Sequence, residues 1–219
     1  MSADSFFHDA VRFMPVLLKG LGVTVLLTLA ALVTSMIIGL GWALMGASKV
    51  APLRASSAIV INFIRGIPII VQLFYVYFVL PELGINLEPF AAGVIGLGLA
   101  YSVYQAENFR GGFASVDRSL VEAGQSLGMS DWLIMRRIIF PLGLRVALPS
   151  FGNTTVMLLK DSSIASTITI AELTRAGQLV AISTFKNGTV YTLVALLYLI
   201  ASLPLARTVR ALERRLSSQ

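Results

Sequence analysis

A short polar segment, Lys160-Asp161-Ser162-Ser163, interrupts an otherwise apolar stretch of this chain. If the segment is helical, Lys160 and Asp161 point about 100° apart and cannot form one good ion pair with each other. Charged side chains at membrane depth are costly and usually face a cavity or a partner on another helix. The segment therefore offers both signs of charge and two hydroxyl groups either to a zwitterionic solute or to neighbouring helices.

Two more polar side chains lie in an earlier apolar stretch. Arg65 precedes Gly66 and Pro68, and a proline inside a helix removes a donor, kinks the helix and frees carbonyl groups that can line a site. Alternatively, Arg65 extends its charged end to the membrane surface. Gln72 follows Arg65 by two helical turns on the same face, where it extends a polar stripe or bonds to another helix.

Glu107 and Arg110 stand at i and i+3 near the end of the next apolar stretch. Residues at this spacing are neighbours on a helix surface, so the two charges either pair with each other or leave Glu107 to a pathway for solute. The candidate pathway residues are therefore Arg65, Gln72, Glu107, Lys160, Asp161, Ser162 and Ser163.

The residues needed for covalent or metal chemistry are scarce. The sequence contains no cysteine, which removes thiolate ligands and Cys nucleophiles. Its single histidine, His8, is expected to be a solvated residue of the tail, and its eleven acids are scattered. We therefore expect no catalytic residue, no metal site and no cofactor in this chain. The sequence also lacks a Gly-x-x-x-x-Gly-Lys-Ser/Thr phosphate loop, so it does not carry an ATPase.

Composition places these residues in a membrane protein. The chain is 56% hydrophobic and 13% charged, whereas soluble domains carry about 25% charged residues. A spanning helix needs about 20 mainly apolar residues. We therefore predict an all-α membrane protein, a single domain over residues 1–219 with five transmembrane helices. The predicted spans are residues 20–47, 57–80, 89–108, 146–170 and 189–206.

The basic residues between the predicted spans set an orientation. Eleven Lys and Arg residues fall on the side of the first loop, the third loop and the C-terminal tail, against four on the other side. Because basic residues favour the cytoplasm, the N-terminus is predicted outside and the third loop and C-terminus inside. The net charge of +6 thus fits a membrane boundary rather than nucleic acid.

The third loop, residues 115–141, is called the polar loop below. Ser119 and Glu122 have the spacing of a capping box, and Gly128 is placed to end the first helix in a left-handed conformation. Ser130 then predicts the start of a second short helix, which Pro141 would close. A connection this long is unusual between neighbouring helices and favours a functional element.

The polar loop resembles the Glu-Ala-Ala loop of importer-type ABC permeases. Glu122, Ala123, Gly128, Ile138 and Pro141 fall on that pattern. Gly124 stands where the pattern has a third-position Ala, and Phe140 stands in place of Leu. Residues 63–74, 107–111 and 159–163 look like the branch that includes histidine, glutamate, glutamine, arginine and opine permeases.

The resemblance implies that the polar loop is a coupling helix that docks on a cytoplasmic ATPase. The residues it assigns to coupling are Glu122, Ala123, Gly124, Leu127, Gly128, Ser130 and Pro141. The implied partners are two ATPase subunits that hold ATP and Mg, a second permease subunit, identical or homologous, and an extracytoplasmic amino-acid-binding protein. The implied location is the bacterial cytoplasmic (inner) membrane, and the implied substrate is a polar amino acid. The alternatives are an ion-coupled small-solute transporter and a membrane-embedded lipid-modifying enzyme.

Overall fold

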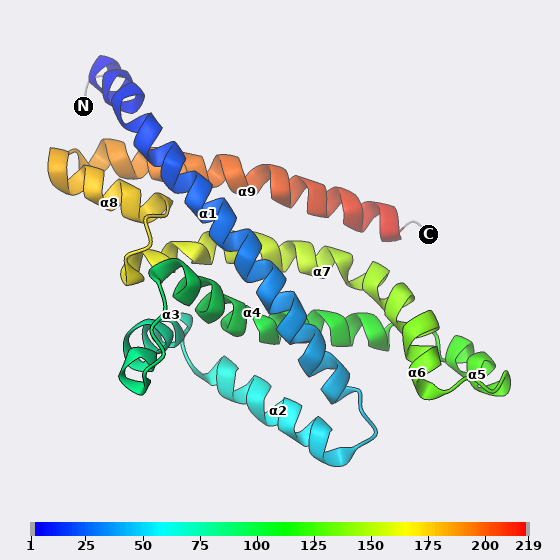
Figure 1. Cartoon of the computed structure of the whole chain (residues 1–219). Helices are drawn as coiled ribbons and strands as arrows, with labels where there is room; N and C mark the ends of the chain where they lie inside the picture. Colours follow the sequence, from blue (N-terminus) through cyan, green and yellow to red (C-terminus); the bar gives the residue numbers. More distant parts are fainter. Residues whose placement is uncertain (1–2, 218–219) are drawn as a thin grey trace.

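The computed structural model describes residues 3–217, and within this range the secondary structure is entirely helical. Figure 1 shows long helices that cross one another, with the two termini toward opposite ends of the molecule. The elements are α1 (Ala3–Gly46), α2 (Ala51–Gly66), α3 (Ile69–Phe74), a π-helical segment (Tyr75–Val79), a 3-10 helix (Leu80–Leu83), α4 (Pro89–Ala114), α5 (Arg118–Ser126), α6 (Asp131–Ile134), a second π-helical segment (Met135–Ile139), α7 (Phe140–Asp161), a second 3-10 helix (Ser162–Ile168), α8 (Leu173–Thr184) and α9 (Asn187–Ser217).

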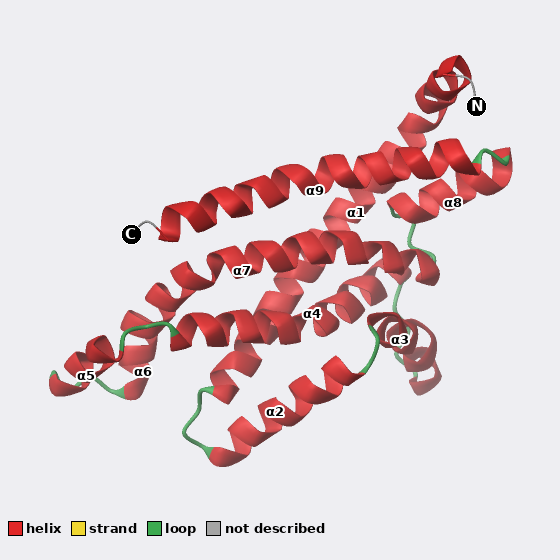
Figure 2. Cartoon of the chain, turned by 180° about the vertical axis from the view of Figure 1, so that it is seen from behind, coloured by secondary structure: helices red, strands yellow, loops and turns green. Residues whose placement is uncertain are grey.

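Helix α1 is the central element of the fold. Its 44 residues extend about 66 Å at the usual helical rise, and it crosses α4, α7 and α9 in Figures 1 and 2. It packs most extensively on α4. The approach is close because Gly39 has no side chain: a Cβ atom there would lie 2.7 Å from the Gln105 Cβ and 2.7 Å from the Ser102 carbonyl oxygen.

Three apolar clusters hold the helices together. The largest joins α1, α3, α4 and the end of α7 through residues such as Leu27, Leu73 and Tyr101. A second cluster, which includes Phe13 and Leu193, joins the beginning of α1 to α8 and α9. A third, smaller cluster links α1, α4 and α7. In this cluster the ring of Phe151 in α7 packs edge-on against the ring of Phe109 in α4, with 4.7 Å between the ring centroids.

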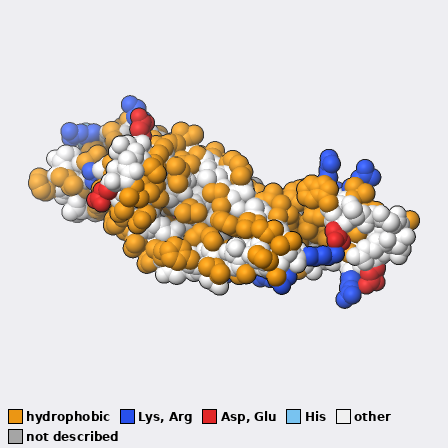
Figure 3. Space-filling model, turned by 60° about the horizontal axis from the view of Figure 1, so that its bottom comes forward, with side chains coloured by type: hydrophobic (Ala, Val, Ile, Leu, Met, Phe, Trp, Pro, Cys, Tyr) orange, Lys and Arg blue, Asp and Glu red, His pale blue; other side chains and the backbone are white. Residues whose placement is uncertain are grey.

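Two helices of the described chain are long and apolar enough to cross a bilayer unaided, at Ser5–Gly46 and Asn187–Leu216. A third span results if Ala51–Gly66 and Ile69–Leu83, bent by 99°, count as one. The all-helical prediction is confirmed, whereas five transmembrane helices are not. Figure 3 shows hydrophobic side chains over the middle of one face and charged ones mostly toward its two ends, which suits a membrane protein because charged side chains are costly at membrane depth.

The structure also differs from the sequence prediction at α1 and α8. Helix α1 begins at Ala3, well before the predicted span, and this first part packs on α8 and α9. Helix α8 lies in a segment predicted to be a loop. Its N-cap is Glu172, which is not among the residues usually preferred at that position. The sequence therefore gave no local signal for its start.

Candidate functional site

The polar loop forms two short helical arms at one end of the molecule, where Figure 2 shows α5 and α6 beyond the ends of α4 and α7. The first arm is α5, and the second arm is α6 with the π-helical segment Met135–Ile139. The N-cap of α5 is Asp117, whose carboxylate accepts a hydrogen bond from the Ser119 backbone N–H at 2.9 Å. This bond lowers the pKa of Asp117 below its ordinary value because it stabilises the charged form. The predicted capping box is therefore wrong, and Glu122 instead pairs with Arg118 at 2.9 Å.

Gly128 ends α5 as predicted. Its φ is +73°, in the left-handed region. The Gly128 N–H donates to the Gln125 carbonyl at 2.9 Å, and the Met129 N–H donates to the Gly124 carbonyl at 3.1 Å. These two bonds are the pair of a Schellman motif, which satisfies carbonyl groups that the helix end would otherwise leave unpaired.

The second arm begins where the sequence predicts and continues farther. The Ser130 hydroxyl accepts from the Leu133 N–H at 3.3 Å and caps α6. The prediction that Pro141 closes this helix is wrong, because the helix continues through the π-helical segment into α7. Pro141 lies in the first turn of α7, just after that wider segment. A proline has no N–H to donate, and the wider π-helical segment just before it is where the regular i→i−4 hydrogen-bond pattern of the helix is interrupted.

Helices α5 and α6 pack closely because Gly124 is buried between them. A Cβ atom at Gly124 would lie 3.0 Å from Ile138 Cδ1 and 3.2 Å from Ile134 Cγ1. This packing turns other apolar side chains outward: Leu127 is 81% exposed and Trp132 is 66% exposed. Large apolar side chains exposed on both arms of one polar loop are candidates for contact with a partner.

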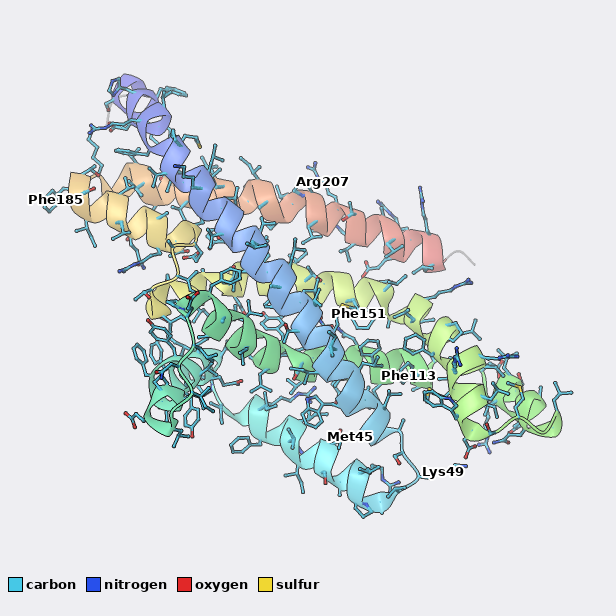
Figure 4. All side chains as sticks on the ribbon, in the orientation of Figure 1. Met45, Lys49, Phe113, Phe151, Phe185 and Arg207 are labelled. Atoms are coloured by element: carbon cyan, nitrogen blue, oxygen red, sulfur yellow. The ribbon has the colours of Figure 1, made fainter. Side chains whose placement is uncertain are left out.

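An ion pair ties the polar loop to the connection between α1 and α2. The Lys49 ammonium lies 2.5 Å from the Asp131 carboxylate. Figure 4 shows Lys49 in the connection that follows α1, on the same side of the molecule as α5 and α6. Both side chains are exposed, so the pair contributes at most about 1 kcal/mol to the stability of the fold.

Among the candidate pathway residues, Arg65 and Glu107 meet between α2 and α4. Their charged groups are 3.5 Å apart, and Arg110 pairs with the same carboxylate. Glu107 therefore lies between two guanidinium groups. This arrangement includes the i, i+3 pair predicted from the sequence and adds the partner from α2.

Gln72 does not share a helix face with Arg65, because the chain bends by 99° between α2 and α3. Its side-chain amide donates to the Ile64 carbonyl at 2.9 Å and to the Ile67 carbonyl at 2.8 Å. Pro68 has no N–H to offer at this break. Gln72 therefore satisfies carbonyl groups that the break frees, and it also lines a mainly apolar cavity of about 370 Å³ beside α2, α3 and α4.

At the end of α7, the Tyr101 hydroxyl donates to the Asp161 carboxylate at 2.6 Å. Tyr101 is fully buried in α4. Lys160 is exposed, and the structure gives it no ion pair among residues 3–217. Ser162 is buried, and its hydroxyl donates to the Leu159 carbonyl at 2.8 Å, whereas Ser163 is partly buried. The candidates thus form separate groups: Arg65 with Glu107, Gln72 at the helix break, and Lys160 to Ser163 at the end of α7.

Sequence reasoning missed a buried carboxylate at the start of α8. Glu172 is fully buried, and it accepts hydrogen bonds from the Thr174 and Arg175 backbone N–H groups at 2.9 and 2.8 Å. The Tyr198 hydroxyl of α9 and the Thr24 hydroxyl of α1 donate to it at 2.8 and 3.3 Å. Glu172 therefore joins three helices. A lone Glu between apolar residues was the one available signal in the sequence.

The chain matches known proteins over most of its length. The family model described as "Binding-protein-dependent transport system inner membrane component" matches residues 35–218. The probable amino-acid ABC transporter permease protein YckA of Bacillus subtilis (strain 168) is 39% identical over 189 residues, which cover 86% of this chain and 84% of that protein. The glutamine transport system permease protein GlnP of Escherichia coli (strain K12) is 36% identical over 206 residues, covering 92% and 93%.

Two solved structures of ABC transporters are also similar to this chain. A protein in a crystal structure of an amino acid ABC transporter with histidines has a TM-score of 0.88 and 35% identity, covering 98% of this chain and 100% of that chain. An inward-facing MetNI methionine ABC transporter has a TM-score of 0.72 at 20% identity, covering 97% and 99%, and shows a shared fold. The resemblance predicted from the polar loop is confirmed: the chain belongs to the family of binding-protein-dependent transport system inner membrane components, and it is an ABC importer permease subunit.

Proposed function

We propose that this permease subunit forms part of an import pathway for polar amino acids and couples it to ATP hydrolysis on a separate cytoplasmic ATPase. The observation that carries the proposal is the geometry of the polar loop. Two short arms, joined at a left-handed Gly128, present Leu127 to the surroundings with 81% of its surface exposed. Its relatives' names support the substrate class, since they are called amino-acid and glutamine permeases.

The docking role for the polar loop follows from its construction. Capped helix ends fix its shape, and the buried Gly124 fixes how its arms pack. A surface that transmits force must be rigid as well as exposed, because a flexible loop would absorb the motion of its partner. We therefore assign coupling to Glu122, Ala123, Gly124, Leu127, Gly128, Ser130 and Pro141.

The partners of the proposed complex are two ATPase subunits with their ATP and Mg, a second permease subunit and an extracytoplasmic amino-acid-binding protein. The charge bias supports an inner-membrane orientation with the N-terminus outside and the polar loop inside. In this arrangement α4 and α7 join α1, α9 and the bent pair α2–α3 as the five spans. The permease itself is then not an enzyme.

The substrate pathway is proposed to use both signs of charge. Asp161 supplies a negative charge beside Tyr101, and Lys160 supplies a positive charge without an ion-pair partner in residues 3–217. The Arg65–Glu107 pair lies along α2 and α4. An amino acid carries an ammonium and a carboxylate, so a polar zwitterion suits these groups better than an apolar solute does.

The test is ATP hydrolysis by the assembled complex in liposomes, with its binding protein and a panel of amino acids. We expect a polar amino acid to stimulate hydrolysis and to accumulate inside the vesicles, while apolar amino acids have little effect. Accumulation driven by an ion gradient without ATP would instead support an ion-coupled transporter. Permease that assembles with no ATPase would contradict the docking role.

A further inference from the structure

An apolar groove lies where the end of α1 meets the polar loop. It has a volume of about 240 Å³, and α1 contributes Leu40 and Leu44 to its wall. The other wall comes from the second arm and the start of α7. The complete lining is Leu40, Leu44, Trp132, Met135, Arg136 and Phe140. Because α1 is one of the helices able to cross a bilayer by itself, this groove opens on a membrane-facing helix near its end.

The charge beside this groove is positive. Arg136 lines it and is exposed, and no hydrogen bond or ion pair of its side chain is found among residues 3–217. The acid nearest in sequence, Asp131, is already paired with Lys49 at 2.5 Å. A basic group at the mouth of an apolar groove matches a molecule with an anionic head and a hydrocarbon tail.

Trp132 adds a second argument for a lipid. It is 66% exposed beside the groove, and tryptophan is enriched where membrane proteins cross the interface because its ring is apolar while its N–H stays wet. An ATPase surface would also accept an exposed Trp. A contact with the ATPase would not explain why the groove is also lined by Leu40 and Leu44 of α1, a helix able to span the membrane.

We propose that this groove binds an anionic membrane phospholipid, with an acyl chain against Leu40, Leu44 and Phe140 and the headgroup phosphate on Arg136. The bound lipid would fill the space between α1 and the second arm of the polar loop. It would therefore hold the loop at a fixed depth, in addition to the Lys49–Asp131 ion pair. This inference concerns lipid and does not depend on which substrate the complex carries.

The experiment measures lipid retained by the purified permease–ATPase complex. Delipidated complex is incubated with phosphatidylglycerol or with phosphatidylcholine, and the bound lipid is counted by native mass spectrometry. We expect phosphatidylglycerol to be retained preferentially, and Arg136→Gln to reduce its retention about fivefold, which is the effect of one basic residue near an anionic surface. Arg137→Gln is the matched control, because Arg137 is also exposed but does not line the groove.

A second variant tests the groove itself. Leu44→Trp fills the apolar volume without changing any charge, so it should also lower phosphatidylglycerol retention while Arg136 remains. Equal losses in Arg136→Gln and Arg137→Gln would show general attraction to basic charge and overturn the site. Equal retention of both lipids would overturn it as well. The readout is lipid stoichiometry, so it separates this inference from failure of transport or coupling.

Discussion

The hydroxyl group of Tyr101 lies 2.6 Å from the carboxylate of Asp161 and donates a hydrogen bond to it. The two residues are sixty positions apart in the sequence and belong to α4 and α7. The bond connects two helices whose polar residues were predicted to face a pathway. The hydrogen-bond partner of Asp161 is thus neutral, and no ion pair joins its carboxylate to a Lys or Arg within residues 3–217.

Asp161→Asn should lower uptake more than tenfold while the complex still assembles. The amide keeps the size of the carboxylate and removes the charge that would pair with the ammonium group of the substrate, and loss of one member of a buried charge pair costs about 2–5 kcal/mol. Transport into liposomes and basal ATP hydrolysis are measured on the same preparation.

Tyr101→Phe provides the comparison for Asp161, because it removes the hydrogen bond and leaves the charge. If Asp161 acts on substrate, Tyr101→Phe should reduce uptake much less than Asp161→Asn does. If Asp161 is only a tie between α4 and α7, both variants should lower the melting temperature by similar amounts with little direct effect on transport by assembled complex.

Gly128→Val should uncouple the complex while leaving the permease inserted. The left-handed φ of +73° at Gly128 costs a residue with a Cβ about 1–2 kcal/mol, and relief of this strain would re-aim the two arms. The measurement is ATPase co-purification together with substrate-stimulated hydrolysis. Gly128→Asn is the control, since Asn tolerates this conformation, and normal transport by Gly128→Val would make the loop a simple connector.

Gly124→Leu should separate α5 from α6, whereas Gly124→Ala should be tolerated. A Cβ atom at this position would lie 3.0 Å from Cδ1 of Ile138 and 3.2 Å from Cγ1 of Ile134, side-chain atoms that can shift by a few tenths of an ångström. A leucine adds three more carbons, and overpacking of this kind costs about 1–3 kcal/mol. The two variants are compared by ATPase binding, and equal binding would argue against a rigid docking surface.

Gln72→Leu should destabilise the permease by about 1–3 kcal/mol, the cost of leaving buried polar groups without a partner. The variant removes the amide that serves the Ile64 and Ile67 carbonyls. Thermal denaturation in detergent provides the measurement. Gln125→Leu makes the same exchange at an exposed position, and equal melting temperatures for the two variants would show that the helix break does not need this amide.

A single cysteine at position 130, introduced by Ser130→Cys, should react with impermeant thiol reagents only from the cytoplasmic side. The protein contains no cysteine of its own, so the label reports this position alone. Ser183→Cys, on the exposed part of α8, should be labelled only from outside. Labelling of the polar loop from outside in intact cells would reverse the proposed orientation.

What the sequence determined by itself was local or compositional. The apolar stretches required a membrane and helices, because a chain in lipid must satisfy its backbone hydrogen bonds internally. The left-handed turn at Gly128 and the cap at Ser130 were predictable because each depends on a few neighbouring residues. The i, i+3 spacing of Glu107 and Arg110 predicted their contact for the same reason.

Only the tertiary structure decided which distant groups meet. Asp117 caps α5 in place of Ser119 because the backbone turns two residues earlier than the capping-box spacing implies. Tyr101 reaches Asp161, and Glu172 reaches α1 and α9, through the packing of helices far apart in the chain. The sequence predicted that Gln72 shares a helix face with Arg65, but the chain bends by 99° between α2 and α3, so the two residues have no common face. The partner of a buried polar group depends on how whole helices cross, and no short stretch of sequence carries that information.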